Sequence, residues 1–403
     1  MSTVIYKLRV IGPRTRDAPQ RNKAHMEYIG RRKGVVLNEG LKHGLFGVVD
    51  GRKAEEISSI SELSRYIESK TRDGTITYRA VASLAEDDAM RLGYNDPVKW
   101  RELVRARMPD MAEKIGIPIH NLEYVAAFHR DKGHPHMHIQ FWDTEQTIKK
   151  DAFVRPKVSA DIRAGLVKYV FGEEMSELQE LKNEARKAAL DNIGGFFGNF
   201  VETLADMTPG EHAAAIERLK LDGDLADGRL IYSRFNTADT RAILSELLEL
   251  SEIVPKTGRL YFKLMPSDVK DAIREFITIV LERNADCDRE FKRYVQAAMD
   301  LSKFYTDKPE VHEKAARAAY DDMTARLGNV VLRTVKRLNQ LERDQSYRRD
   351  MIEGLVTELF SVLARSADSG ERTVAYRAGE LSKQARKEQA MQLENTGSCD
   401  WGR

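Results

Sequence analysis

Histidine is concentrated in one short stretch of the chain. Four of the nine histidines fall within the segment HRDKGHPHMH, at His129, His134, His136 and His138. An apolar run before this segment and an alternating run after it predict two strands joined by a polar turn. Because strand side chains alternate between the two faces of a sheet, the last three histidines share one face, and His129 can reach it from across the turn. Three neutral imidazoles converging on one point would make a divalent-metal site with coordination positions open for a substrate.

A metal centre of this kind suits phosphoryl chemistry. The bound ion can hold a phosphate oxygen and neutralise the charge that builds in the transition state. Attack by hydroxide would give hydrolysis, whereas attack by a tyrosine phenolate would leave a covalent phosphotyrosine on the substrate. Tyr28 lies in the middle of a predicted helix, with His25 one helical turn before it on nearly the same face. A histidine that does not bind the metal could act as the base.

The elements that must position these residues can be predicted from periodicity and turn signals. We expect strands at 3–10 and 75–82 and helices at 23–32, 55–69 and 96–114, with Asn22 and Asp96 as caps. The glycine-rich segment 42–51 reads as a loop. This order is typical of an α+β sheet with helices on one face.

The rest of the chain has helical periodicity almost throughout. A short extended piece is expected at 258–264, a flexible break at Gly194, Gly195 and Gly198, and a polar, disordered tail. We therefore divide the chain into an α+β domain at 1–150, a helical domain at 151–380 that grips DNA or binds partners, and a tail at 381–403.

Composition excludes several classes of protein. The 403 residues have 32% charged side chains, a net charge of +2 and two cysteines without a partner motif, which argues against a disulfide framework. No signal peptide or membrane span is expected, and the predicted compartment is the cytoplasm. Residues 1–42 carry ten Lys or Arg against three Asp or Glu. This excess is either a patch facing an acidic polymer or a solvated charge run.

The histidine segment reproduces a known motif. His129, Asp131, His134, His136 and His138 match the HxDxxHxHxH pattern of HUH-type relaxases, the single-strand endonucleases that start conjugative transfer of plasmids and transposons. Further stretches resemble the MobL-type relaxases of the MOBP class. These stretches are IYKLRV near the N-terminus, EYIGRRKGV at 27–35, HGLFG at 43–47, ITYRAVASLAEDDAMRLG at 76–93 and, more weakly, GRLYFKLMPSDVK at 258–270.

The resemblance implies a strand-specific nick in single-stranded DNA at an origin of transfer, after which the enzyme stays joined to the 5′ phosphate. It implies an antiparallel sheet with the topology of an RNA-recognition motif and flanking helices, followed by a mostly helical region. The expected cofactor is Mn²⁺ or Mg²⁺. The expected partners are origin DNA, accessory relaxosome proteins and a coupling protein.

The resemblance also assigns roles to single residues. Tyr28 aligns with the nucleophile, and His129, His136 and His138 with the three metal ligands. His134 and Asp131 would support them, Asp131 by accepting an imidazole N–H. Ser83 would help to hold DNA near the nick, and Arg31, Arg32 and Lys33 would contact phosphates.

Alternatives remain open for several of these residues. Tyr28 could be an ordinary amphipathic-helix tyrosine, Ser83 a capping serine, and the three cations solvent-facing. Because some related relaxases use a histidine nucleophile, His25 is the alternative to Tyr28. The family's short apolar run ending in Asn is absent after His138, where Ile139, Gln140, Phe141, Trp142 and Asp143 follow.

Two other functions compete with a relaxase. Alternating histidines are also typical of histidine-triad nucleotide hydrolases or transferases, although Gln140 interrupts the apolar run that such enzymes require. The other alternative is a non-catalytic DNA-binding replication module that keeps the fold, against which the intact histidine set argues.

Overall fold

The computed structural model describes residues 4–131, 134–147, 153–220 and 238–368. The chain forms two compact units, of which the first holds Met1–Ala188 and Arg289–Met323 and the second Ala189–Asp288 and Thr324–Arg403. The predicted tail at 381–403 lies outside the described residues, and the domain boundaries at 150 and 380 stay predictions.

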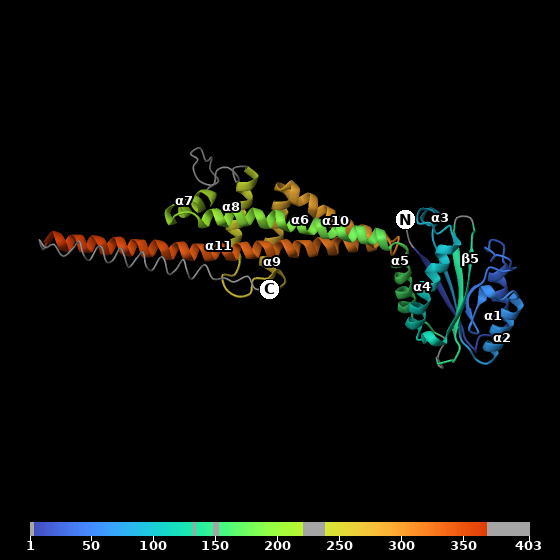
Figure 1. Ribbon diagram of the computed structural model, residues 1–403. Coiled ribbons are helices and arrows are strands. Elements are labelled where there is room, and N and C mark those ends of the chain that lie inside the picture. Colours follow the sequence, from blue (N-terminus) through green and yellow to red (C-terminus); the bar gives the residue numbers. More distant parts are fainter. Residues whose placement is uncertain (1–3, 132–133, 148–152, 221–237, 369–403) are drawn as a thin grey trace. The chain divides into compact units, whose positions relative to one another are not determined.

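The first unit is built on a six-stranded antiparallel sheet (Figure 1). Its spatial order is β1-β4-β6-β5-β2-β3, so β6 and β5 are inner strands. The strands are β1 (Ile5–Ile11), β2 (Phe46–Val49), β3 (Arg52–Lys53), β4 (Thr77–Ser83), β5 (Leu122–His129) and β6 (His136–Asp143). The structure confirms the predicted α+β class and the predicted hairpin.

Strand β2 corrects one prediction, because its residues were expected to be a loop. Gly47 has φ +132°, and a Cβ at this position would lie 2.2 Å from the carbonyl oxygen of Tyr124 on β5. Glycine is therefore required here for close approach to the neighbouring strand. It does not mark a loop.

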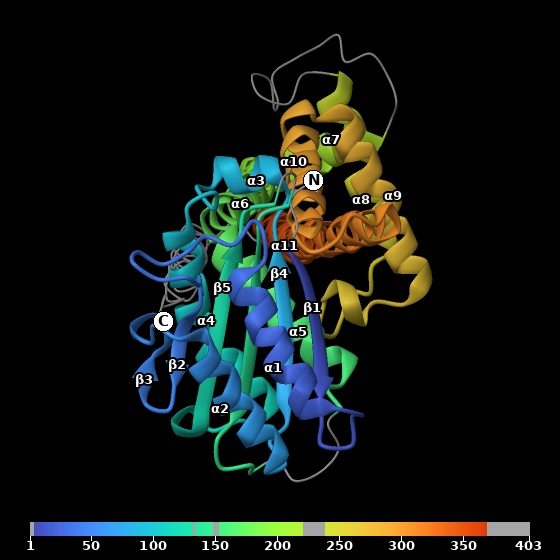
Figure 2. The ribbon, with the colours of Figure 1, turned by 90° about the vertical axis from the view of Figure 1, so that its right-hand side faces the viewer.

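Helices cover both faces of the sheet, which contradicts the prediction that they lie on one. Figure 1 shows α4 (Pro97–Ile115) and α5 (Pro156–Val170) on one side and α1 (Ala18–Arg31) and α2 (Ile60–Arg72) on the other, and Figure 2 looks onto the α1 side. The reason is that the hairpin is apolar on both faces. Val125, Ala127 and Trp142 pack towards α1 and α2. Phe128, Ile139 and Phe141 pack in the opposite core with α4 and α5.

The helix ends differ in part from prediction. α1 begins at Ala18 with Pro19 in its first turn, so Asn22 is a buried residue inside the helix and does not cap it. α2 begins at Ile60, after a short 3₁₀ turn at Ala54–Glu56. α4 agrees with prediction, since the Asp96 carboxylate accepts a hydrogen bond from the Val98 N–H at 2.9 Å. A short helix α3 (Glu86–Arg91) follows β4.

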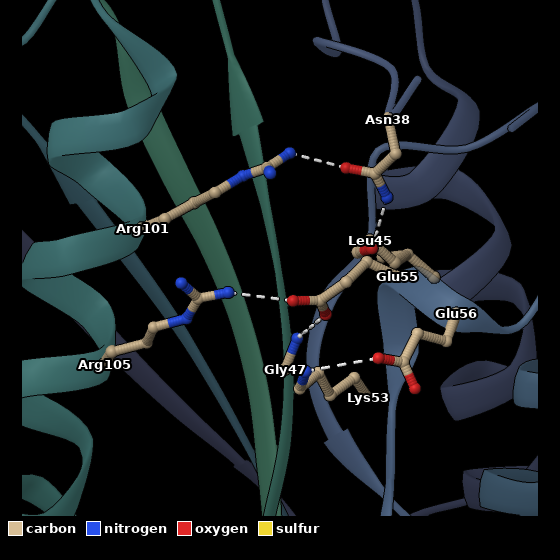
Figure 3. Close-up of polar contacts among 8 residues, drawn as sticks. All are labelled: Asn38, Leu45, Gly47, Lys53, Glu55, Glu56, Arg101 and Arg105. Atoms are coloured by element: carbon tan, nitrogen blue, oxygen red, sulfur yellow. Dashed lines mark hydrogen bonds and ion pairs between the residues drawn. The ribbon is translucent and has the colours of Figure 1, made fainter. Parts of the chain in front are cut away.

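Polar contacts from α4 fix the segment between α1 and β2 (Figure 3). Arg101 donates to the side-chain oxygen Oδ1 of Asn38 at 2.5 Å, and the side-chain Nδ2 of Asn38 donates to the main-chain oxygen of Leu45 at 2.6 Å. Arg105 donates to Glu55 at 2.8 Å, and Glu55 also accepts the Gly47 N–H. These contacts hold the HGLFG segment in place, and its Gly44 N–H donates to the Gly30 carbonyl at the end of α1.

The remaining helices are α6 (Gly172–Ala205), α7 (Pro209–Lys220), α8 (Ala238–Ile253), α9 (Ser267–Arg283), α10 (Ala285–Lys303) and α11 (Pro309–Asp368). α6 runs without interruption through Gly194, Gly195 and Gly198, so the predicted break there is wrong. Residues 262–264 form a 3₁₀ turn in place of the predicted extended piece. Among the described residues, no helix is both long and apolar enough to cross a membrane.

Candidate active site

The hairpin brings His129, His136 and His138 together on one face of the sheet. His129 on β5 pairs directly with His136 on β6, and His138 is two residues further along the same face. One ring nitrogen from each can be chosen so that all three lie within 4.8 Å of one another. The ring centroids are 4.8 to 5.2 Å apart. This spacing allows one ion to be bound by all three imidazoles.

Hydrogen bonds determine which nitrogen each ring can offer. The His129 Nε2–H donates to the Ile29 carbonyl at 2.9 Å, and the His136 Nδ1–H donates to the His134 carbonyl at 2.9 Å. These bonds leave His129 Nδ1 and His136 Nε2 with free lone pairs. His129 Nδ1 and both nitrogens of His138 are buried without a hydrogen-bond partner. Because buried polar atoms are normally satisfied, these orphaned nitrogens fit a divalent metal.

The same surroundings keep the rings of His129 and His138 uncharged. Burial, reinforced by the neighbouring imidazoles, lowers the pKa of His129 to about 4 and that of His138 to about 3. Both rings are therefore neutral at pH 7, the form that binds a metal.

Helix α1 carries Tyr28 along this face of the sheet. The Ile29 carbonyl that His129 contacts belongs to the residue after Tyr28, so this hydrogen bond ties His129 to the backbone next to the tyrosine. The Tyr28 side chain is 51% exposed, whereas Met26 and Ile29 are buried in the core beneath the helix. The tyrosine is thus accessible to a large substrate.

Arg32 links Tyr28 to the end of β5. Its guanidinium carbon lies 5.5 Å from the centre of the Tyr28 ring, and its Nη2 forms an ion pair with Asp131 at 3.0 Å. Asp131 thus has an arginine partner in this structure, whereas the expectation was that it would accept an imidazole N–H.

His25 lies beside His138 but in a different environment. Its Nδ1 is 2.8 Å from Gln140 Oε1, and its ring meets that of His138 edge-on, with centroids 6.3 Å apart. Burial, together with the charge of Arg79, lowers the pKa of His25 to about 4. His25 is therefore neutral and fixed in orientation, which suits a positioning group better than an accessible nucleophile.

A buried polar network behind His25 could not be foreseen from the sequence. Gln140 donates to the side-chain oxygen Oδ1 of Asn22 at 3.3 Å. The same oxygen accepts from Thr77 at 2.9 Å and from Arg79 at 2.7 Å. The only available signal was that Gln140 continues the spacing of two residues from His136 and His138. From the sequence alone, Gln140 is only a departure from a motif.

The other predicted residues lie around the site. Ser83 is buried, faces His136 in the β4–β6 register, and donates to the Pro135 carbonyl at 3.2 Å. The His134 side chain is exposed, and only its carbonyl contacts the ligand set. Arg31 and Lys33 are exposed at the end of α1, whereas Arg32 is half-buried in its contact with Asp131.

Comparison with known proteins gives one match. Residues 25–204 match the sequence model of a family described as MobL relaxases. A search of curated proteins and a search of solved structures found no significant match. The matched range begins at His25 and includes Tyr28, the histidine hairpin and the whole of α6 except its last residue.

Proposed function

We propose that this chain, a MobL-type relaxase by the match over residues 25–204, nicks single-stranded DNA at an origin of transfer through Tyr28. The observation that carries the proposal is the convergence of three imidazoles beside a helix that exposes a tyrosine. The metal, Mn²⁺ or Mg²⁺, would be held by His129 Nδ1, His136 Nε2 and one nitrogen of His138. When bound, it supplies Lewis-acid activation of the scissile phosphate.

The chain's own residues carry the transesterification. Tyr28 Oη attacks the phosphorus, the P–O bond to the 3′ oxygen breaks, and the 5′ phosphate becomes a phosphotyrosyl ester. The phenol proton passes to water at this exposed position, and the 3′ oxygen takes a proton from water. His25 is a poor proton acceptor because its pKa is low, so we assign it to positioning.

Two features support Tyr28 over His25 as the nucleophile. Tyr28 is half exposed, whereas His25 is tied to Gln140 and buried against His138. The Arg32 guanidinium lies over the Tyr28 ring and is itself anchored by Asp131. The supporting role of Asp131 is therefore to fix the end of α1.

The proposal extends to partners. Exposed Arg31 and Lys33 would contact DNA phosphates. Ser83 would help to hold the DNA near the nick through its hydrogen bond to the Pro135 carbonyl, just before β6. Accessory relaxosome proteins and a coupling protein are the further expected partners, and the cytoplasm is the expected compartment. The histidine-triad alternative is less well supported, because only His136 and His138 of its three alternating histidines lie in the cluster, whereas the His134 side chain is exposed.

A nicking assay tests the proposal. The full chain is incubated with single-stranded DNA from the origin of the mobile element that encodes it, and products are resolved on a denaturing gel. We expect nicking with Mn²⁺ or Mg²⁺ and none in EDTA. The Tyr28→Phe variant should lose nicking while keeping DNA affinity, and Tyr169→Phe, which changes an exposed tyrosine on α5, should retain both. Full activity in EDTA would refute the metal mechanism.

A further inference from the structure

A groove in the second unit is lined by cations from two separate segments. Lys256 comes from the segment after α8, and Lys336 and Arg343 come from α11. The groove has a volume of about 560 Å³. Lys336, Gln340 and Arg343 follow a spacing of four and three residues, so they share one face of α11.

Cations outnumber acidic side chains in the lining of this groove. Residues 253–267 contain Lys256, Arg259 and Lys263 and no Asp or Glu. All three are exposed, as are Lys336 and Arg343. Asp344 is the acidic residue among those lining the groove, and within the described parts of the chain neither Lys256 nor Lys336 forms an ion pair. A concave surface with this charge attracts a polyanion.

Exposed aromatic rings accompany the cations. Tyr261 is 41% exposed and follows the groove residue Leu260, and Tyr347 is 58% exposed, one helical turn beyond Arg343. Gly258 turns the chain here with φ +95°, and a Cβ at this position would meet nothing within 4 Å. Cations that follow a phosphate backbone, together with rings on which bases stack, are the features of a surface for single-stranded nucleic acid.

We propose that this groove binds single-stranded DNA independently of base sequence, as a second grip on the strand that the relaxase processes. The identity of the strand rests on the proposed function; the affinity of the groove does not. From Lys336 to Arg343 the helix rises by about 10 Å, which gives a row of charges for a repeating phosphate backbone rather than for a single anion. An acidic peptide would satisfy the cations but would leave the tyrosines without a partner.

The test uses the full chain in EDTA, so that binding is measured without nicking. The probe is a fluorescent single-stranded oligonucleotide of arbitrary sequence. Its fluorescence anisotropy reports binding, which is measured over a series of salt concentrations. The double variant Lys336→Gln/Arg343→Gln should bind about tenfold more weakly at 0.1 M salt, and its salt slope should fall by about 1.4. Tyr347→Ala should also weaken binding by about tenfold, through the loss of base stacking.

The matched control is Lys314→Gln/Arg317→Gln, which removes two exposed cations of α11 outside the groove. It should leave affinity and salt slope unchanged. Equal affinities of the groove and control variants would overturn the proposal, and so would poly-glutamate that binds the wild type as tightly as DNA does.

A parallel assay for the covalent adduct separates this proposal from the proposed function. Suppose that the groove variant binds DNA more weakly but the wild-type chain forms no adduct. That result would support the groove as a DNA-binding surface and refute the nicking mechanism. Unchanged binding, in a protein that forms the adduct, would refute the groove alone.

Discussion

His138 is the side chain in the site with the least support from the protein. Both of its ring nitrogens are buried, and neither has a hydrogen-bond partner. His129 and His136, by contrast, each donate one N–H to a main-chain carbonyl. A bound cation would satisfy His138, so this residue should report on the metal most sharply.

Metal affinity gives the first prediction. Replacing His138 with Ala removes one of three ligands, so the affinity for Mn²⁺ measured by calorimetry should fall about 100-fold or more. The control is His120→Ala, which changes an exposed histidine outside the site and should bind Mn²⁺ as the wild type does. Unchanged affinity in His138→Ala would remove this residue from the ligand set.

The pH dependence of stability gives the second prediction. The pKa of His129 is about 4 in the folded chain and near 6.5 when unfolded, so the unfolded state binds the proton first as pH falls. The free energy of unfolding of the metal-free protein should therefore decrease from about pH 6.5 towards pH 4, by up to about 1.4 kcal/mol per pH unit for this residue. Urea titrations in EDTA should show a smaller decrease in His129→Gln. An identical pH profile in that variant would contradict the assignment.

At the scale of single residues, the sequence predicted which histidines come together better than the contacts that orient their neighbours. The spacing of His136 and His138 specified their shared face because strand geometry is regular. The partners of Asp131 and Gln140 depend on how α1 docks on the sheet, and local sequence does not encode that docking. Gln140 and Asn22 lie 118 positions apart in the chain and meet only in the fold.

Among the elements, α1 determines where Tyr28, the proposed nucleophile, lies. Its C-terminal end is fixed by the hydrogen bond from His129 to Ile29, by the Gly44 N–H on the Gly30 carbonyl, and by the Arg32–Asp131 ion pair. Gly30 also allows the helix to approach its neighbours closely. A Cβ at this position would lie 2.4 Å from Ile60 Cδ1 and 3.0 Å from Leu45 Cγ.

Substitution of Gly30 gives the third prediction. Gly30→Ala should displace α1, lower the free energy of unfolding by about 1–3 kcal/mol and reduce nicking, because Tyr28 moves with the helix. Gly194→Ala is the matched control, since Gly194 lies within α6 and a Cβ there would meet nothing within 4 Å. It should be neutral or stabilise by up to about 1 kcal/mol. A Gly30→Ala variant as stable and active as the wild type would contradict the close packing.

The hairpin and α4 could be predicted because their signals are local, namely an apolar run and an alternating run for the strands and an Asp-Pro start for the helix. β2 could not, since its glycine reflects an approach to β5 that only the tertiary structure shows. The glycines of α6 predicted a break in the helix, and the helix continues through them for a different reason. Packing of the helix, for example Phe197 stacked on Phe276 with centroids 6.0 Å apart, overrides their low helix propensity.

For the whole molecule, charge is nearly balanced at a net +2, so the proposed affinity for DNA has to come from local patches. One such patch is the end of α1. Arg31 and Lys33 are exposed there, whereas the Arg32 guanidinium is already paired with Asp131. The two exposed cations are therefore the better candidates for phosphate contacts.

The fourth prediction follows from this difference. Arg31→Gln/Lys33→Gln should weaken binding of single-stranded origin DNA and reduce the salt slope by about 1.4, as two lost phosphate contacts require. Anisotropy over a salt series measures both quantities, with Lys314→Gln/Arg317→Gln again as the control of equal charge. A salt slope that stays at the wild-type value would show that the two cations only face solvent.

The central claim, that Tyr28 is the nucleophile, is tested most directly by mapping the covalent adduct. The wild-type chain is incubated with Mn²⁺ and single-stranded origin DNA, digested with trypsin and nuclease, and analysed by fragmentation mass spectrometry. Tyr28 and His25 fall in one tryptic peptide, AHMEYIGR, so the fragment ions must locate the nucleotide. We predict an acid-stable phosphotyrosyl ester on Tyr28. An acid-labile adduct on His25, or an adduct that persists in Tyr28→Phe, would contradict the account.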